Sequence, residues 1–151
     1  MKLRLISALV LTALLASTPM VQAVDSGGSS TSVSVSDQLS AARAQIKSQK
    51  WAAAIDTLKL ALEAEPNNAD ANNLMGYSLR KSGNVQRAEG FYLKALKLSP
   101  KHKGANEYLG ELYVEIGQLE KAKQRLEVLE GVCGTGCEEY KDLKAAIDKA
   151  S

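Results

Sequence analysis

The chain has 151 residues, with 19 basic residues against 17 acidic ones and only two cysteines. This length is typical of one domain. The excess of positive charge comes from Lys2 and Arg4, and without these two the 17 remaining basic residues equal the 17 acidic ones. A neutral chain lacks the basic surface that nucleic-acid binding requires, so we expect no nucleic-acid partner.

The first 23 residues have the order of a secretory signal peptide. Lys2 and Arg4 form a basic start, residues 5–16 are an apolar run, and small residues at 21 and 23 mark a cleavage site. The apolar run is too short to span a membrane, and a retained signal anchor is the alternative reading. The sequence therefore predicts an exported chain that begins at Val24, with no membrane insertion after cleavage. Its predicted location is the bacterial periplasm.

Residues 24–36 are rich in Ser and Gly and carry little apolar mass. Such a segment cannot offset its ordering entropy, so we predict a flexible leader. Its alternating Ser and Val residues leave open a second reading, in which the segment pairs as a strand on a partner.

A period of 34 residues runs through the rest of the chain. Three pairs of identical residues have this spacing: Pro66 and Pro100, Gly76 and Gly110, and Gly83 and Gly117. Three longer columns share it: Ala54, Ala88 and Ala122; Leu58, Tyr92 and Leu126; and Ala61, Ala95 and Leu129. One period across six columns indicates a repeat architecture.

This pattern resembles the tetratricopeptide repeat family, whose 34-residue unit has small residues at positions 8, 20 and 27, a turn Gly and a late Pro. The middle unit, residues 69–102, matches best, whereas in the first unit Gln49 replaces the turn Gly. The family's Trp at position 4 is absent, and Gln38, Asn72 and Asn106 stand there. The resemblance implies an all-α fold, a right-handed superhelical stack of three helix-turn-helix hairpins over about 35–68, 69–102 and 103–134.

A seventh helix is predicted over about 136–150, which completes a repeat domain over 37–151. Tyr140, Leu143, Ile147 and Ala150 form one apolar stripe, and the other positions are mostly charged. Terminal repeats need a capping element with a polar outer face, and this helix fits that role.

In this family the first helix of each repeat lines a concave groove at fixed positions. Carried over by the resemblance, these partner-binding positions are Arg43, Lys47, Asn73, Tyr77, Arg80, Lys81, Glu107, Glu111 and Glu115. The three glutamates are spaced four residues apart and so share one helix face. We expect a bipolar groove that suits a peptide with both signs of charge. The alternative is that these charges pair across neighbouring helices on solvated faces.

One known subtype of the family is not expected. Members that grip a chaperone's C-terminal carboxylate use Lys and Asn at positions where this chain has Leu39 and Arg43, and Asn where it has Leu74.

Cys133 and Cys137 are the second distinctive feature. In an exported protein a disulfide is the default, and it would fasten the capping helix to the third repeat. Two readings compete: thiol exchange, favoured by a cysteine in the first turn of a helix, and binding of a soft metal such as copper(I). His102, between Lys101 and Lys103, is expected to be a solvated turn residue rather than a ligand. With so few ligands, we predict no metal site.

The sequence contains no phosphate-binding loop, paired catalytic carboxylates or nucleophile elbow. We therefore predict no enzymatic activity and no cofactor. The resemblance implies a periplasmic adaptor that binds an unidentified protein or peptide in envelope or secretion assembly. A thiol-redox or copper-handling protein and a self-associating scaffold are the alternatives.

Overall fold

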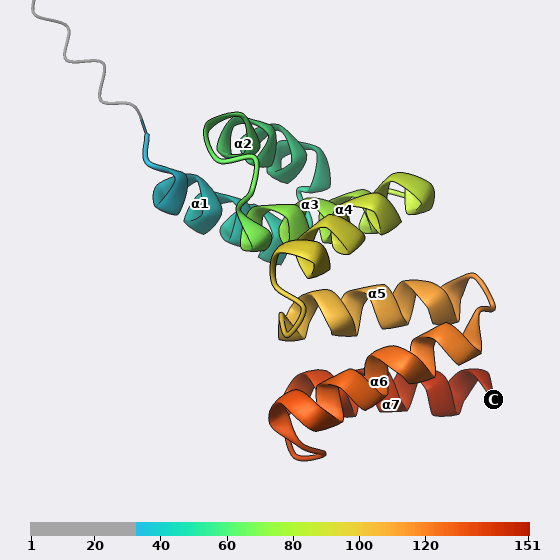
Figure 1. Cartoon of the computed structure of the whole chain (residues 1–151). Coiled ribbons are helices and arrows are strands. Elements are labelled where there is room, and N and C mark those ends of the chain that lie inside the picture. The colour runs from blue at the N-terminus through green and yellow to red at the C-terminus, as the bar shows by residue number, and fades with distance from the viewer. Residues whose placement is uncertain (1–32) are drawn as a thin grey trace, which may run out of the picture. The chain divides into compact units, whose positions relative to one another are not determined.

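The computed structural model describes residues 33–151, which include the whole repeat region. The predicted signal peptide (1–23) and the leader up to residue 32 lie outside these described residues. All regular structure in the described part is helical (Figure 1). The seven helices are α1 (Val35–Lys47), α2 (Trp51–Ala64), α3 (Ala69–Lys81), α4 (Val85–Leu98), α5 (Lys103–Glu115), α6 (Leu119–Cys133) and α7 (Glu138–Ala150). Between residues 33 and 151 no helix combines the length and the apolar character needed to cross a bilayer.

Consecutive helices pack as three hairpins, α1 with α2, α3 with α4, and α5 with α6. Each hairpin packs on the next through the α2–α3 and α4–α5 contacts, and α7 covers α5 and α6. This arrangement confirms the predicted all-α stack of three hairpins with a C-terminal capping helix.

Two predicted boundaries differ from the structure. Helix α1 begins at Val35, so the last two residues of the predicted leader belong to the helix, and α7 begins at Glu138 rather than 136. The start of α1 follows from its cap, because the Ser34 side chain accepts a hydrogen bond from the Asp37 backbone N–H. Ser34, Asn68 and His102 each cap the first helix of a repeat, 34 residues apart.

The turns inside the hairpins require a left-handed backbone. Gly83 and Gly117 have φ of 87° and 75°, as expected for glycines that end a helix. In the first hairpin Gln49 adopts the same conformation, with φ of 56°. The chain geometry therefore repeats even where the glycine does not.

Replacing Gln49 with Gly should stabilise the protein. A side chain in the left-handed region costs roughly 1–2 kcal/mol, and relief of this strain is partly offset by the greater flexibility of Gly in the unfolded chain. We expect a net gain of about 0.5–1 kcal/mol in the free energy of unfolding, measured in urea. A matched Lys50→Gly change, at a cap residue with φ of −87°, should not stabilise the protein. Equal effects of the two changes would contradict this account.

The core lies between the two helices of each hairpin and between successive hairpins. The small residues of the repeat, such as Ala54, Ala88 and Ala122, have no exposed surface and allow close helix approach. Larger side chains that fill the remaining space are buried: Met75, Leu79, Tyr92, Leu109 and Tyr113. Leu126 is only partly buried. In α7, Leu143 and Ile147 are buried, but Ala150 is exposed, so the apolar stripe is shorter than predicted.

Asn72 and Asn106 occupy the positions where the family pattern has Trp, and both are fully buried. The Asn72 amide donates to the backbone carbonyls of Asn68 (2.7 Å) and Pro66 (3.3 Å). The Asn106 amide donates to the carbonyls of His102 (3.0 Å) and Pro100 (3.1 Å). Hydrogen bonds to the turn between repeats thus replace the packing of an indole ring.

Candidate functional site

The first helices of the hairpins form one side of the stack. Helix α1 packs against α3, α3 against α5, and α5 against α7, whereas α2, α4 and α6 do not contact one another within residues 33–151. The side made by α1, α3, α5 and α7 is therefore the inner face, because its helices are the closer together. All nine predicted groove residues lie on helices of this inner face.

Arg80 of α3 lies at the centre of the inner face but is buried, with 5% of its surface exposed. Its Nη2 donates to Glu111 Oε2 at 2.5 Å, and its Nη1 lies 3.4 Å from Glu115 Oε1. Nη1 also donates to the Tyr108 carbonyl at 3.4 Å. The guanidinium carbon lies 5.7 Å from the Tyr77 ring centroid. Arg80 therefore ties α3 to α5.

The ion pairs of Arg80 leave fewer unpaired charges in the groove than the bipolar model expects. Arg80 and two of the three predicted glutamates neutralise one another across α3 and α5. Arg43 likewise lies 3.0 Å from Asp70 on α3. Arg80 and Arg43 therefore pair with acids of neighbouring helices, as the alternative interpretation predicted. Lys47 and Lys81 make no ion pair within residues 33–151, and the Lys81 Nζ lies 5.5 Å from the Tyr77 ring centroid.

An aromatic cluster surrounds Arg80. The Tyr77 ring lies 4.7 Å from the Tyr108 ring and 6.1 Å from the Trp51 ring, measured between centroids. The Tyr92 ring, fully buried, lies 6.4 Å from the Tyr108 ring. Burial raises the pKa of Tyr108 to about 12, and it also raises the pKa of Tyr77. These hydroxyls stay neutral at physiological pH, and Tyr77 and Tyr108 are each only partly buried.

Glu107 of α5 is the unusual acid of the inner face, because only 7% of its surface is exposed. Burial, together with the charges of Glu111, Asp142 and Glu139, raises the pKa of this carboxyl to about 8 against the opposing effect of Arg80. Its carboxyl makes no ion pair or hydrogen bond with a side chain in the described part of the chain. Two of these neighbours, Glu139 and Asp142, belong to α7.

The stability of the protein should depend on pH through Glu107. Its pKa is 4.5 in an unperturbed chain and about 8 in the fold, so between these values the folded chain holds a proton that the unfolded chain has released. Raising the pH through this window therefore favours unfolding, by at most about 1.4 kcal/mol per pH unit. Urea unfolding from pH 5 to 8 should show this decline in the wild type and less of it in Glu107→Gln. Glu130→Gln, at an exposed site on α6, should follow the wild type, and identical pH profiles for all three proteins would contradict the assignment.

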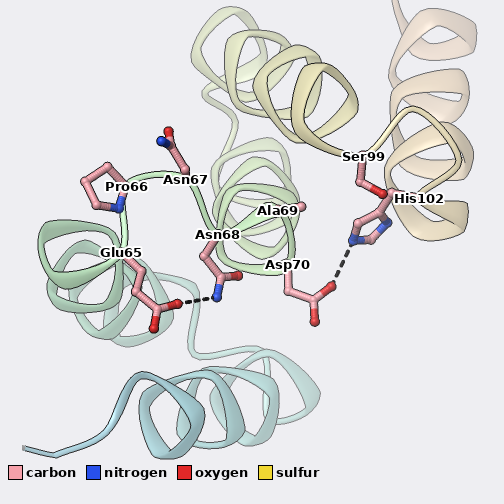
Figure 2. Close-up of a pocket in the computed structure, with 8 residues that line it drawn as sticks. All are labelled: Glu65, Pro66, Asn67, Asn68, Ala69, Asp70, Ser99 and His102. Carbon is pink, nitrogen blue, oxygen red and sulfur yellow. Dashed lines mark hydrogen bonds and ion pairs between the residues drawn. The ribbon is translucent and has the colours of Figure 1, made fainter.

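A pocket of about 580 Å³ lies at the edge of the inner face, between the turns that precede α3 and α5. Figure 2 shows Asp70 and His102 pointing toward each other across it, with Asp70 Oδ1 2.9 Å from His102 Nε2. His102 Nδ1 accepts the Ala105 backbone N–H at 3.1 Å, which places the proton on Nε2. Because Arg43 also bonds Asp70, a polar chain runs from α1 through α3 to the start of α5.

His102 was expected to be a solvated turn residue, but it caps α5 and is mostly buried. Its 34-residue spacing from the cap Asn68 was a signal of this role in the sequence. Its pairing with Asp70 had no such signal, because it depends on how two turns meet.

The two cysteines lie between α6 and α7. The structure brings their sulfur atoms to bonding distance, with the Cα atoms 5.9 Å apart, a separation typical of disulfides. Gly134, the first residue of the connecting turn, has φ of 74° and ends α6. The Glu139 carboxylate lies near the sulfurs, and a hydrogen bond from Lys103 lowers its pKa. The disulfide stays a prediction for the protein in its own compartment.

Solved structures with the same arrangement come from several sources. A tetratricopeptide repeat protein from Parabacteroides merdae is 17% identical with a TM-score of 0.67, covering 80% of this chain and 47% of that chain. This chain therefore spans about half the length of that protein. The first such domain of Spaghetti, bound to an HSP90 peptide, is 19% identical (TM-score 0.68; 77% and 91% covered). The Yersinia enterocolitica secretion chaperone SycD, in complex with a peptide of the translocator YopD, is 16% identical (TM-score 0.65; 77% and 88% covered).

At these identities the structural similarity shows a shared fold. No curated protein matches the sequence. Two family models described as tetratricopeptide repeat do match it, one over residues 39–103 and the other over 79–147. Together they extend from α1 into α7, through all three hairpins. The chain belongs to the tetratricopeptide repeat family.

Proposed function

We propose that this protein is a non-enzymatic adaptor that binds a peptide segment of another protein along its inner face. The observation that carries the proposal is the partly uncovered pair of rings, Tyr77 and Tyr108, at the centre of that face. Exposed Lys81 lies beside the Tyr77 ring, and exposed Glu115 pairs with Arg80, which also lies beside that ring. Aromatic rings within a charged rim are typical of surfaces that bind proteins.

Two structural relatives support a peptide as the partner. Spaghetti was solved with an HSP90 peptide and SycD with a YopD peptide. The carboxylate grip of chaperone-binding members is not carried over to this chain, because Leu39 and Leu74 stand at its positions. We therefore propose a different peptide as its ligand.

We further propose that the protein acts in the periplasm, in envelope or secretion assembly. The support is the signal-peptide pattern of residues 1–23, and the two cysteines suit an oxidising compartment. Protein recovered from a periplasmic extract should begin at Val24, and recovery only from the cytosol with Met1 intact would contradict this location.

A pair of photo-crosslinking variants tests the binding face. Benzoylphenylalanine at Lys81 lies on the inner face, whereas at Lys94 it lies on α4, and both positions are exposed. In cells the Lys81 variant should form a discrete adduct with another protein, and the Lys94 variant should not. Adducts from Lys94 alone would contradict the proposal. An adduct with the mass of two copies of this chain would instead favour self-association.

A second candidate function uses the cysteine pair for thiol exchange or copper(I) handling. The observation in its favour is that the sulfurs of Cys133 and Cys137 and a carboxylate oxygen of Glu139 lie within 4.8 Å of one another. Thiols should be counted on protein isolated from its own compartment, with and without denaturant. Two reactive thiols in the native protein would favour this function, whereas a disulfide that resists mild reduction would leave a structural link between α6 and α7.

A further inference from the structure

An amide, Asn73, and an acid, Glu107, are both buried on the inner face. Asn73 of α3 is 5% exposed, and its Oδ1 has no hydrogen-bond partner in the described residues. Glu107 of α5 is similarly buried, and its carboxyl has no side-chain partner there. The Asn73 side chain reaches α5 one turn before Glu107, because a Cβ on Gly104 would lie 3.2 Å from the Asn73 amide nitrogen. Buried polar groups are nearly always satisfied, so the Asn73 acceptor lacks a donor.

The charges around Glu107 are mostly negative, which favours a positively charged donor. Glu107, Glu111, Glu139 and Asp142 form an acidic cluster contributed by α5 and α7. Two cations pair with carboxylates of this cluster. Arg80 pairs with Glu111 and also with Glu115, which is outside the cluster, and Lys103 lies 2.8 Å from Glu139. Neither Glu107 nor Asp142 makes an ion pair within residues 33–151. The missing donor should therefore be positively charged.

The spacing of the cluster distinguishes between kinds of cation. Among the described residues, no three of these carboxylates bring oxygens within 4.8 Å of one another, so they do not form a metal site. A guanidinium carries five N–H donors on a planar fork and an ammonium carries three on a flexible stem, so either can reach acceptors that are farther apart. A long basic side chain can therefore reach acceptors that are too far apart to bind one metal ion.

We propose that the acidic cluster and Asn73 receive an Arg or Lys side chain of the peptide bound on the inner face. This inference rests on the proposed function and adds the chemistry of the partner. The neighbouring rings of Tyr77 and Tyr108 pack against the aliphatic part of the peptide, while its cation enters between α5 and α7. Because Arg80 is already paired with Glu111 and Glu115, it takes no part in binding an acidic residue of the partner.

The test uses the full chain as purified and a displayed library of random 12-residue peptides. Peptides selected on the wild type should share an Arg or Lys at one position. A synthetic copy of a selected peptide, tested above pH 8 where the Glu107 carboxyl is ionised, should bind about tenfold or more weakly when this Arg is replaced by neutral citrulline, or when Glu107 is changed to Gln. The two changes together should add little to either alone, since both remove one interaction.

Matched variants keep the result interpretable. Glu107→Gln should fold, because it mimics the protonated carboxyl that burial favours, and its fold is checked by circular dichroism. Glu130→Gln removes an exposed charge on α6 and should bind the peptide as the wild type does.

The outcomes separate this inference from the proposed function. One outcome is that peptides cross-link at Lys81 and yet bind with unchanged affinity when their Arg is replaced by citrulline or when Glu107 is changed to Gln. That result would support peptide binding on the inner face and overturn the proposed site for a basic side chain. If no peptide is enriched and none cross-links at Lys81, both proposals fail. If the wild type dimerises and Glu107→Gln does not, the cation comes from a second copy, and the peptide proposal is again overturned.

Discussion

Replacing Arg80 with Met should lower the free energy of unfolding by about 2–4 kcal/mol. Removing one partner of a buried ion pair typically costs 3–5 kcal/mol, because the remaining charge stays desolvated. Here Glu111 and Glu115 are partly exposed, with 26% and 49% of their side chains accessible, so water can recover part of the loss. The repulsion among Glu107, Glu111 and Glu115 adds to the cost. Urea unfolding at neutral pH measures the change.

The neighbouring lysine provides the control for Arg80. Lys81 lies on the same helix and is exposed, so Lys81→Met should change stability by no more than about 0.5 kcal/mol. Adding Glu111→Gln to Arg80→Met should restore about 1 kcal/mol, because it removes a carboxylate that has lost its cation. If Arg80→Met and Lys81→Met behave alike, Arg80 is not a structural tie and is free for a ligand.

Replacing Gly76 with Ala should destabilise the protein by about 1–3 kcal/mol, even though Ala is the better helix former by about 1 kcal/mol. A Cβ at this position would lie 2.7 Å from both Cδ1 and Cε1 of Tyr92. The Tyr92 ring is fully buried, and a contact this short requires a shift of the ring or of the helices. Either shift disturbs the packing of α3 on α4. Thermal and urea unfolding both report this change.

Gly90 offers a matched control within the partner helix. It lies inside α4, and a Cβ there would meet no atom within 4 Å. Gly90→Ala should therefore stabilise the protein by about 0.5–1 kcal/mol, in the opposite direction to Gly76→Ala. A stabilising effect of both substitutions would show that α3 and α4 do not approach closely at Gly76.

The groove residues were harder to predict than the fold. Resemblance placed Arg80, Glu107 and Glu111 on the first helices of their repeats, where the structure has them, but it treated all three as charges available to a ligand. In the structure Arg80 forms ion pairs with Glu111 and Glu115, which are 31 and 35 residues away in the chain. The special environment of Glu107 depends on Glu139 and Asp142, which reach it only because α7 folds back against α5.

The sequence by itself determined the seven helices, their pairing and the turns, because these depend on local rules that recur every 34 residues. Gly83 and Gly117 end helices through their own backbone freedom, and the alanine columns allow close packing wherever they occur. Only the tertiary structure decided which charges are paired, that His102 bonds Asp70, and that the Asn73 acceptor remains without a donor. Burial and pairing depend on side chains from different repeats meeting in space, and a one-dimensional period carries no information about these contacts. The export signal remains a prediction from sequence, and the proposed receptor for a basic side chain follows from the contacts between α3, α5 and α7.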